Sequence, residues 1–249
     1  MKKQHIKIKM ADGVCDAYIA SPDTNENLPA VLLYMDAFGP RERLFAMADR
    51  IASEGYFVLL PNVFYRMKAA PVVDIEKMGQ KNSHFVELIP QIMPLIEAWS
   101  PEHQKKDAKD YLAFLRKETQ SDKVGCVGYC MGGSAALRAA AAYPEHVQAV
   151  ASYHAGRIGA DTPNSVLKVL PQIKAEVYIA HADKDNSMPA DQIERVRQTL
   201  DSAHVKFKAE LYKEAEHGFT MSDHPAYNPR AEIKHWETLF DLFDRTLHL

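Results

Sequence analysis

The chain has 249 residues, of which 47% are hydrophobic, and its 30 basic and 33 acidic residues leave a formal net charge of −3. Such a composition is typical of a globular domain with a full core, and it offers neither a basic surface for nucleic acid nor an acidic disordered tail. No apolar run approaches the roughly 18 residues of a membrane-spanning helix, and the first residues lack the apolar segment of a signal peptide.

The first two predicted elements are the strands of an antiparallel hairpin. Polar and apolar residues alternate over residues 5–10, which is the period of a half-solvated strand. Ala-Asp-Gly at residues 11–13 is typical of a turn, and a second strand follows over residues 14–20.

From residue 30 onward, short apolar runs alternate with helical patterns. We expect strands at residues 31–35, 56–60, 124–127, 149–153, 177–180 and 205–211. Helices are expected at residues 43–53, 101–117, 134–142, 193–200 and 233–247. Continuous apolar strands separated by helices indicate a parallel sheet covered on both faces. The predicted fold class is therefore α/β, a mostly parallel central sheet with an N-terminal antiparallel hairpin, and residues 1–249 are expected to form a single domain.

Residues 67–99 are the least regular part of the chain. Pro71, Pro90 and Pro94 interrupt short apolar groups, so we expect a loop and broken helices there. An insertion of this kind often shapes a pocket, but it can equally just cover the sheet, and both readings stay open.

Residues 128–133 read Gly-Tyr-Cys-Met-Gly-Gly and stand between the predicted strand 124–127 and the helix 134–142. A strand that turns sharply into a helix needs small residues on either side of the apex, because side chains there would collide. The apex residue, Cys130, would be held in a strained conformation with its side chain exposed above the sheet. This is the pattern of a nucleophile elbow, and the unpaired N–H groups of the helix N-terminus favour negative charge on the sulfur.

The other two cysteines are expected to be structural. Cys126 lies within an apolar strand and Cys15 within the opening hairpin. Three separated cysteines do not form a disulfide framework, so we expect a cytoplasmic protein whose catalytic thiol stays reduced.

A nucleophile elbow predicts an acid and a base later in the chain, in that order. Asp185 follows the strand 177–180 and precedes Pro189, which is expected to start the next helix. Asp183 is its competitor in the same loop. His217 follows the last strand, where it would accept the thiol proton while the acid holds its tautomer.

An oxyanion hole is the remaining requirement. One donor is expected to be the N–H of Met131, directly after the nucleophile. The other is expected from the loop after the strand 31–35, with Ala37 as the best candidate.

Two further residues have an open interpretation. His154 follows the strand 149–153, where it would either line the substrate pocket or simply cap the strand. Arg66 would either bind an anionic group of the substrate or form an ion pair that fixes its loop. We expect no metal site, since no histidines, cysteines or aspartates show zinc-ligand spacing, and no cofactor, since the chain has no glycine-rich phosphate loop.

The chain closely resembles the dienelactone hydrolase family, which has the α/β-hydrolase fold. The resemblance extends from the opening hairpin to the last helix and rests on residues 128–133, on the strand and Tyr-Arg pair within 56–66, on the Asp-to-Pro spacing at 185–189, and on Ala-Glu-His-Gly-Phe at 215–219. A cysteine where most α/β-hydrolases have serine makes the match specific. The resemblance implies a Cys-His-Asp triad made of the nucleophile, base and acid named above.

Two positions depart from the family pattern. Dienelactone hydrolases carry a glutamate after the first parallel strand that engages the resting thiol, and here that place is taken by Asp36. They also carry an arginine four residues after the histidine that grips the substrate carboxylate, and here that residue is Met221. The family implies substrate-facing roles for both positions, and the methionine argues against dienelactone itself as the substrate.

We therefore expect a hydrolase that cleaves a small carboxylic ester or lactone through a thioester acyl-enzyme. It is expected to act as a monomer or homodimer, without nucleic-acid or membrane partners. Two alternatives stay open: an acyltransferase that uses an acceptor other than water, and a non-catalytic ligand-binding or regulatory protein that keeps the α/β-hydrolase fold.

Overall fold

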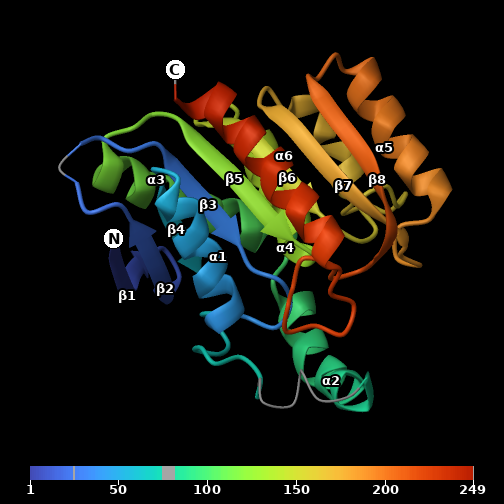
Figure 1. Ribbon diagram of the computed structural model, residues 1–249, viewed down its shortest axis with the longest axis horizontal. Helices are drawn as coiled ribbons and strands as arrows, with labels where there is room; N and C mark the ends of the chain where they lie inside the picture. The colour runs from blue at the N-terminus through green and yellow to red at the C-terminus, as the bar shows by residue number, and fades with distance from the viewer. Residues whose placement is uncertain (25, 75–81, 249) are drawn as a thin grey trace.

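The computed structural model describes residues 1–24, 26–74 and 82–248 (Figure 1). Its strands are β1 (Lys2–Met10), β2 (Gly13–Ser21), β3 (Ala30–Tyr34), β4 (Phe57–Pro61), β5 (Val124–Tyr129), β6 (Val147–Tyr153), β7 (Glu176–Lys184) and β8 (Phe207–Glu216). Its α-helices are α1 (Glu42–Ser53), α2 (Asn82–Ala98), α3 (Pro101–Thr119), α4 (Met131–Ala142), α5 (Ala190–Ser202) and α6 (Pro229–Leu247). Two short 3₁₀ turns, Val166–Lys168 and Leu170–Gln172, lie between β6 and β7.

The strands form one sheet in the order β1-β2-β4-β3-β5-β6-β7-β8. The β2 strand pairs antiparallel with both β1 and β4, and every other pairing in the sheet is parallel. The α/β class, the mostly parallel sheet and the opening hairpin are confirmed. Because β3 and β5 are neighbours and parallel, the loops that follow them leave the same edge of the sheet.

Helices cover both faces of this sheet, as the apolar strands predict. Helices α1 and α6 lie on one face, in front of the sheet in Figure 1, and α3 and α4 pack together on the other. The Arg50 guanidinium of α1 stacks over the Trp236 ring of α6 at 4.4 Å, which joins the two front helices. All residues of β3 and β5 are buried, so these strands need apolar side chains on both faces rather than an alternating pattern.

The expectation of broken helices over residues 67–99 is wrong for its second half. The α2 helix runs without interruption over Asn82–Ala98 although it contains Pro90 and Pro94. Each proline removes a backbone hydrogen bond, but the burial of Leu88 and Ile92 compensates for that loss. Residues 67–74 form a loop, and residues 75–81 lie outside the described residues.

The strands β7 and β8 are longer than their apolar runs. They pair as far as Ala182 with Tyr212 and, after an irregularity, Lys184 with Glu216. The ends of both strands carry polar side chains, so a search for apolar runs does not detect them.

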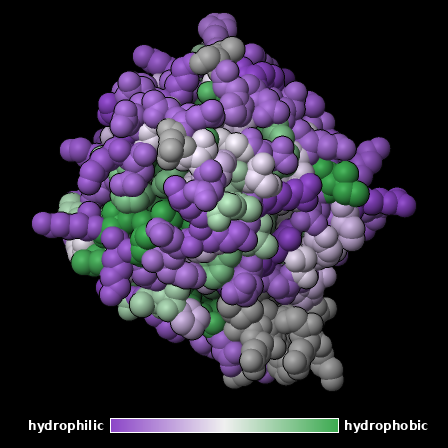
Figure 2. Space-filling model, turned by 60° about the vertical axis from the view of Figure 1, so that its left-hand side comes forward, coloured by the Kyte–Doolittle hydropathy of each residue, from purple (hydrophilic) through white to green (hydrophobic). Residues whose placement is uncertain are grey.

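None of the described helices is long and apolar enough to span a membrane. On the face that Figure 2 shows, hydrophilic residues dominate and apolar ones form small patches among them.

Candidate active site

The predicted nucleophile lies in a sharp turn between β5 and α4. Cys130 has a φ of 55° and a ψ of −122°, a conformation that residues other than glycine seldom adopt. Its N–H donates to the Tyr153 carbonyl over 3.1 Å, and its own carbonyl accepts the N–H of Gly133 over 3.1 Å. The neighbouring strand and the first helical turn therefore hold the strained residue in place.

Two glycines permit this turn because backbone atoms come too close for a side chain. A Cβ added at Gly128 would lie 2.0 Å from the Gly132 carbonyl oxygen. A Cβ added at Gly132 would lie 2.3 Å from the Met35 carbonyl oxygen. The turn thus has the geometry of a nucleophile elbow, and the end of β3 packs directly against the start of α4.

Three side chains from separate loops meet at this turn. His217 follows β8, and its Nε2 lies 3.0 Å from the Cys130 sulfur. The Nδ1 atom of the same ring lies 2.7 Å from Oδ2 of Asp185, in the loop after β7. The structure therefore brings together the three residues in the order that a triad of nucleophile, base and acid requires.

The electrostatics of the site favour the charged forms of His217 and Asp185. Burial alone would lower the pKa of His217, but the negative charge on the Cys130 sulfur and the hydrogen bonds with Asp185 and Cys130 outweigh it and raise this pKa to about 11. Burial would raise the pKa of Asp185, but the hydrogen bond and charge of His217 hold it below its ordinary value. At neutral pH the imidazole is therefore protonated and the carboxylate is ionised.

Ser187 fixes the orientation of the Asp185 carboxylate. Its backbone N–H donates to Asp185 Oδ1 over 2.8 Å, and its hydroxyl donates to the same oxygen over 2.6 Å. The competing acid, Asp183, is exposed and instead accepts the backbone N–H of Glu214 over 3.0 Å. The sequence did not single out Ser187, although a residue two positions after an aspartate often donates its N–H in such a turn.

The two predicted oxyanion-hole donors lie in adjacent loops. Met131 is the first residue of α4, so its N–H has no partner within the helix. Ala37 lies in the oxyanion loop, which we define as residues 36–39. Its neighbours are engaged, because Phe38 donates its N–H to the Asp36 carboxylate over 3.1 Å and Gly39 donates to the Asp36 carbonyl over 3.4 Å. No hydrogen bond within the described part of the chain uses the Ala37 N–H.

His154 is buried and lies against His217. Its ring is buried, and its centroid is 5.4 Å from that of His217 at an interplanar angle of 66°. The Nε2 atom shares a hydrogen bond with the Thr220 hydroxyl over 2.8 Å. Burial and the nearby histidines keep the pKa of His154 well below its usual value, so the ring is neutral. Of the two interpretations of His154, its burial argues against the substrate-lining one, and its ring instead packs against the proposed base.

The carboxylate of Asp36 pairs with an arginine. Its side chain is buried, and both of its carboxylate oxygens accept hydrogen bonds from the Arg41 guanidinium, over 2.7 and 2.8 Å. The same guanidinium donates to Asp223 over 2.6 Å. The substrate-facing role that the family implies for Asp36 is thus corrected, because the carboxylate pairs with Arg41. The sequence did not reveal Arg41 or Asp223, which lie 182 residues apart.

Arg66 and Met221 are also unavailable to a substrate. The Arg66 guanidinium donates to Asp107 over 2.6 Å and to Asp12 over 2.9 Å, so the ion-pair interpretation of this residue is the right one. Met221 is buried in the segment after His217. Of the two interpretations of Arg66, the structure therefore shows the ion pair, and the substrate-facing role that the family implies for the position of Met221 is not supported by its burial.

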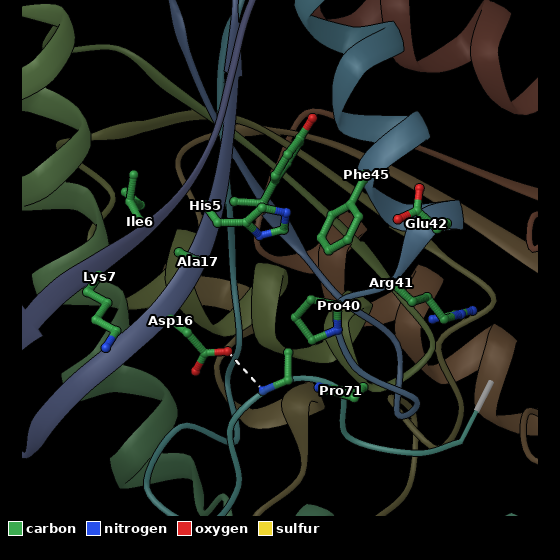
Figure 3. Close-up of a pocket in the computed structure, with 12 residues that line it drawn as sticks. His5, Ile6, Lys7, Asp16, Ala17, Pro40, Arg41, Glu42, Phe45 and Pro71 are labelled. Carbon is green, nitrogen blue, oxygen red and sulfur yellow. Dashed lines mark hydrogen bonds between the residues drawn. The ribbon is translucent and has the colours of Figure 1, made fainter.

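A cavity of about 660 Å³ lies apart from the triad, between the β1–β2 hairpin and the start of α1. Figure 3 shows the rings of His5 and Phe45 close together in it, with their centroids 5.0 Å apart. Pro40 and Arg41 also line this cavity, and the Arg41 guanidinium points away from His5. No residue of the candidate triad is among those that line the cavity.

The two remaining cysteines are buried thiols and not further candidate nucleophiles. Cys15 and Cys126 are buried, and burial raises the pKa of Cys15 to about 12 and the pKa of Cys126 well above its usual value. Within the described ranges, no group of three or more histidine, cysteine or acidic side chains is placed to hold a metal ion.

Comparison with family models identifies one family, and relatives and solved structures resemble the chain along most of its length. The model of the dienelactone hydrolase family matches residues 15–247. A carboxymethylenebutenolidase of Rhodococcus opacus is 27% identical over 235 residues, which are 92% of this chain and 85% of that protein. Among solved structures, a dienelactone hydrolase-like promiscuous phosphotriesterase from metagenomic libraries has a TM-score of 0.82 at 19% identity and 98% coverage of both chains. A dienelactone hydrolase of Anabaena variabilis has a TM-score of 0.70 at 18% identity, over 99% of this chain and 98% of its own.

Proposed function

Because the chain belongs to the dienelactone hydrolase family, we propose that it hydrolyses a carboxylic ester or lactone with Cys130 as the nucleophile. The observation that carries this proposal is the continuous hydrogen bonding from the Cys130 sulfur to His217 over 3.0 Å and on to Asp185 over 2.7 Å. Family membership supports the hydrolase class, and this geometry supports the choice of nucleophile.

Acylation begins from the thiolate. The Cys130 sulfur attacks the carbonyl carbon of the substrate, and the carbonyl electrons move to its oxygen. The N–H groups of Ala37 and Met131 stabilise that oxyanion. As the tetrahedral intermediate collapses, His217 gives its proton to the departing alkoxide, which leaves as an alcohol and leaves a thioester on the enzyme.

Deacylation returns the enzyme to its resting state. His217, now neutral, takes a proton from a water molecule whose oxygen attacks the thioester carbonyl. The second tetrahedral intermediate expels the Cys130 sulfur as a thiolate and releases the carboxylic acid. Throughout the cycle Asp185, itself held by Ser187, keeps Nδ1 of the imidazole protonated and oriented.

The substrate is proposed to lack the carboxylate that characterises dienelactone. Met221 offers no positive charge at the position where the family places an arginine, and it is buried. Arg66 and Arg41 are each paired with two carboxylates. Short uncharged esters and lactones are therefore the expected substrate class.

The decisive experiment compares Cys130→Ala with Cys126→Ala. Hydrolysis of a short p-nitrophenyl ester should fall by at least about 10³-fold in the first variant and stay at the wild-type rate in the second, since Cys126 is buried within β5. Mass spectrometry of the rapidly quenched reaction should find the acyl group on the peptide that contains Cys130.

Three results would count against the proposal. Full activity of Cys130→Ala would remove the sulfur from the mechanism. Diversion of all the product to an added alcohol or thiol would indicate an acyltransferase. Absence of turnover on every ester and lactone, together with alkylation of Cys130 no faster than free cysteine, would indicate a non-catalytic protein.

A further inference from the structure

The guanidinium of Arg41 is buried between two carboxylates from different loops of the candidate site. Nη1 and Nη2 donate to the two oxygens of Asp36 over 2.7 and 2.8 Å. Nε and Nη2 donate to the two oxygens of Asp223 over 2.6 and 3.1 Å. Nη1 also donates to the Gly39 carbonyl over 3.2 Å, so every N–H of the guanidinium has a partner.

Each carboxylate belongs to a segment that carries a part of the proposed machinery. Asp36 directly precedes Ala37, and its Oδ1 also accepts the backbone N–H two residues further on, so its side chain shapes the oxyanion loop. Asp223 belongs to the histidine loop, which we define as residues 217–228 and which begins with the proposed base. Arg41 therefore joins the loop of the oxyanion donor to the loop of the base.

The histidine loop has a second attachment that does not involve Arg41. Arg43 donates to the Thr220 carbonyl over 2.5 Å and also pairs with Glu232 of α6. The Thr220 hydroxyl in turn bonds to His154, whose ring packs against His217. Loss of Arg41 should consequently disturb the oxyanion loop more than the position of the base.

Charge gives Arg41 a second effect on the oxyanion loop. Without its partner, the Asp36 carboxylate would place a negative charge one residue from the Ala37 N–H and oppose the charge that develops on the substrate oxygen. Burial alone would lower the pKa of Arg41, but the charges and hydrogen bonds of Asp36 and Asp223 raise it above its ordinary value. The guanidinium thus stays positive and compensates Asp36 at every pH of interest.

We propose that Arg41 is a positioning residue of the ester hydrolysis, which neutralises Asp36 and holds the oxyanion loop against the histidine loop. This inference rests on the proposed function. Because the sulfur of Cys130 has its partner in His217, at 3.0 Å, Arg41 acts on the formation of the tetrahedral intermediates and not on the formation of the thiolate.

The test measures these two steps separately in Arg41→Met, which keeps an unbranched side chain similar to the aliphatic part of arginine and removes the guanidinium and its charge. With a p-nitrophenyl ester, kcat should fall by about 10²-fold, the effect of losing one oxyanion-hole donor, while KM changes by less than about threefold. The rate at which iodoacetamide alkylates Cys130 should stay within about threefold of the wild-type rate, since His217 and Asp185 are untouched.

Two further variants test the geometry and guard against a failure to fold. Arg41→Lys restores the charge but not the fork of donors, and it should recover about tenfold of the lost kcat. Asp223→Asn keeps an acceptor for Nε and removes one charge, so it should fold and lower kcat by a few fold at most. The control is Arg66→Met, which removes an arginine that is also held by two carboxylates but touches neither loop.

The outcomes separate this inference from the proposed function. An unchanged kcat in Arg41→Met, or an equal loss in kcat and in alkylation rate, would overturn the positioning role. An equal loss of kcat per folded molecule in Arg66→Met would also overturn it. If Cys130→Ala retains full activity, the nucleophile itself is wrong, and that result does not depend on any Arg41 variant.

Discussion

Arg41 and Arg66 are each held between two carboxylates, and the structural context of the two clusters differs. Arg41 lies between Asp36 and Asp223, with its side chain fully buried. Arg66 lies between Asp12 and Asp107, with 15% of its side chain exposed. Both guanidinium groups form a two-pronged contact with their more buried carboxylate.

The difference lies in what the carboxylates are attached to. Asp12 belongs to the turn of the opening hairpin and Asp107 to α3, so Arg66 joins structural elements at the rim of the sheet. Asp107 also accepts hydrogen bonds from the Tyr65 hydroxyl and the Trp99 indole. The Arg41 cluster instead connects two loops of the candidate active site. The same ion-pair chemistry therefore serves the stability of the fold in one place and the proposed reaction in the other.

Arg66→Met should strongly reduce stability without changing kcat. It would leave the Asp107 carboxylate buried, with two neutral donors and no cation, and removal of one partner of such a pair costs about 3–5 kcal/mol. Urea unfolding should record that loss, while kcat per folded molecule stays at the wild-type value. A stable variant with reduced kcat would erase the distinction between the two clusters.

A smaller effect is expected when Asp36→Asn is added to Arg41→Met. The asparagine removes the negative charge that the lost arginine no longer compensates, so the double variant should recover about tenfold of the kcat that Arg41→Met lost. Steady-state kinetics of the two single variants and the double variant provide the measurement. If the double variant is as slow as Arg41→Met, neutralisation of Asp36 is not what Arg41 contributes.

The smallest expected effect is the loss of stability at acid pH that comes from His224, a half-buried histidine near the Arg41 cluster. Burial, with smaller contributions from the charges of His217 and Arg41, lowers the pKa of His224 to about 4, against about 6.5 in an unfolded chain. Between these values the unfolded state binds more protons, so this histidine removes stability as the pH falls from about 6.5 to about 4.

His224→Asn tests this contribution, because its side-chain oxygen can still accept the Ala226 N–H that His224 Nδ1 accepts over 3.0 Å. Thermal unfolding measured from pH 7 to pH 4 should show a shallower loss of stability in this variant than in the wild type. His204→Asn is the matched control, since it replaces an exposed histidine at a φ of 54° that asparagine tolerates. Equal pH dependence in all three proteins would contradict the effect.

The fold could be predicted from the sequence where burial leaves a local pattern. The strands β3 and β5 are buried on both faces, and their continuous apolar runs identified them within one or two residues. The α2 helix was missed because its two prolines weaken the local pattern, whereas the burial of Leu88 and Ile92 is a tertiary property. The ends of β7 and β8 were missed because polar residues continue the pairing.

In the candidate site, too, some features follow from a local sequence pattern and others depend on tertiary packing. Cys130, Asp185 and His217 each follow a strand, in the order that the elbow requires, and His217 lies within hydrogen-bonding distance of both other residues. Four residues to which the sequence assigned substrate-facing roles are engaged elsewhere or buried: Asp36, Arg66, His154 and Met221. The family pattern tells where a residue stands in the sequence. It does not tell which residue of opposite charge pairs with it in the folded protein.

The order of residues by itself determined the parallel sheet, the elbow and the sequence positions of the three proposed catalytic residues, because each depends on a strand and the few residues that follow it. Only the tertiary structure decided the partners of the buried charges. Arg41 pairs with an acid 182 residues away, and no local pattern records such a contact. A buried charge must find a partner of opposite sign, and packing decides which one is within reach.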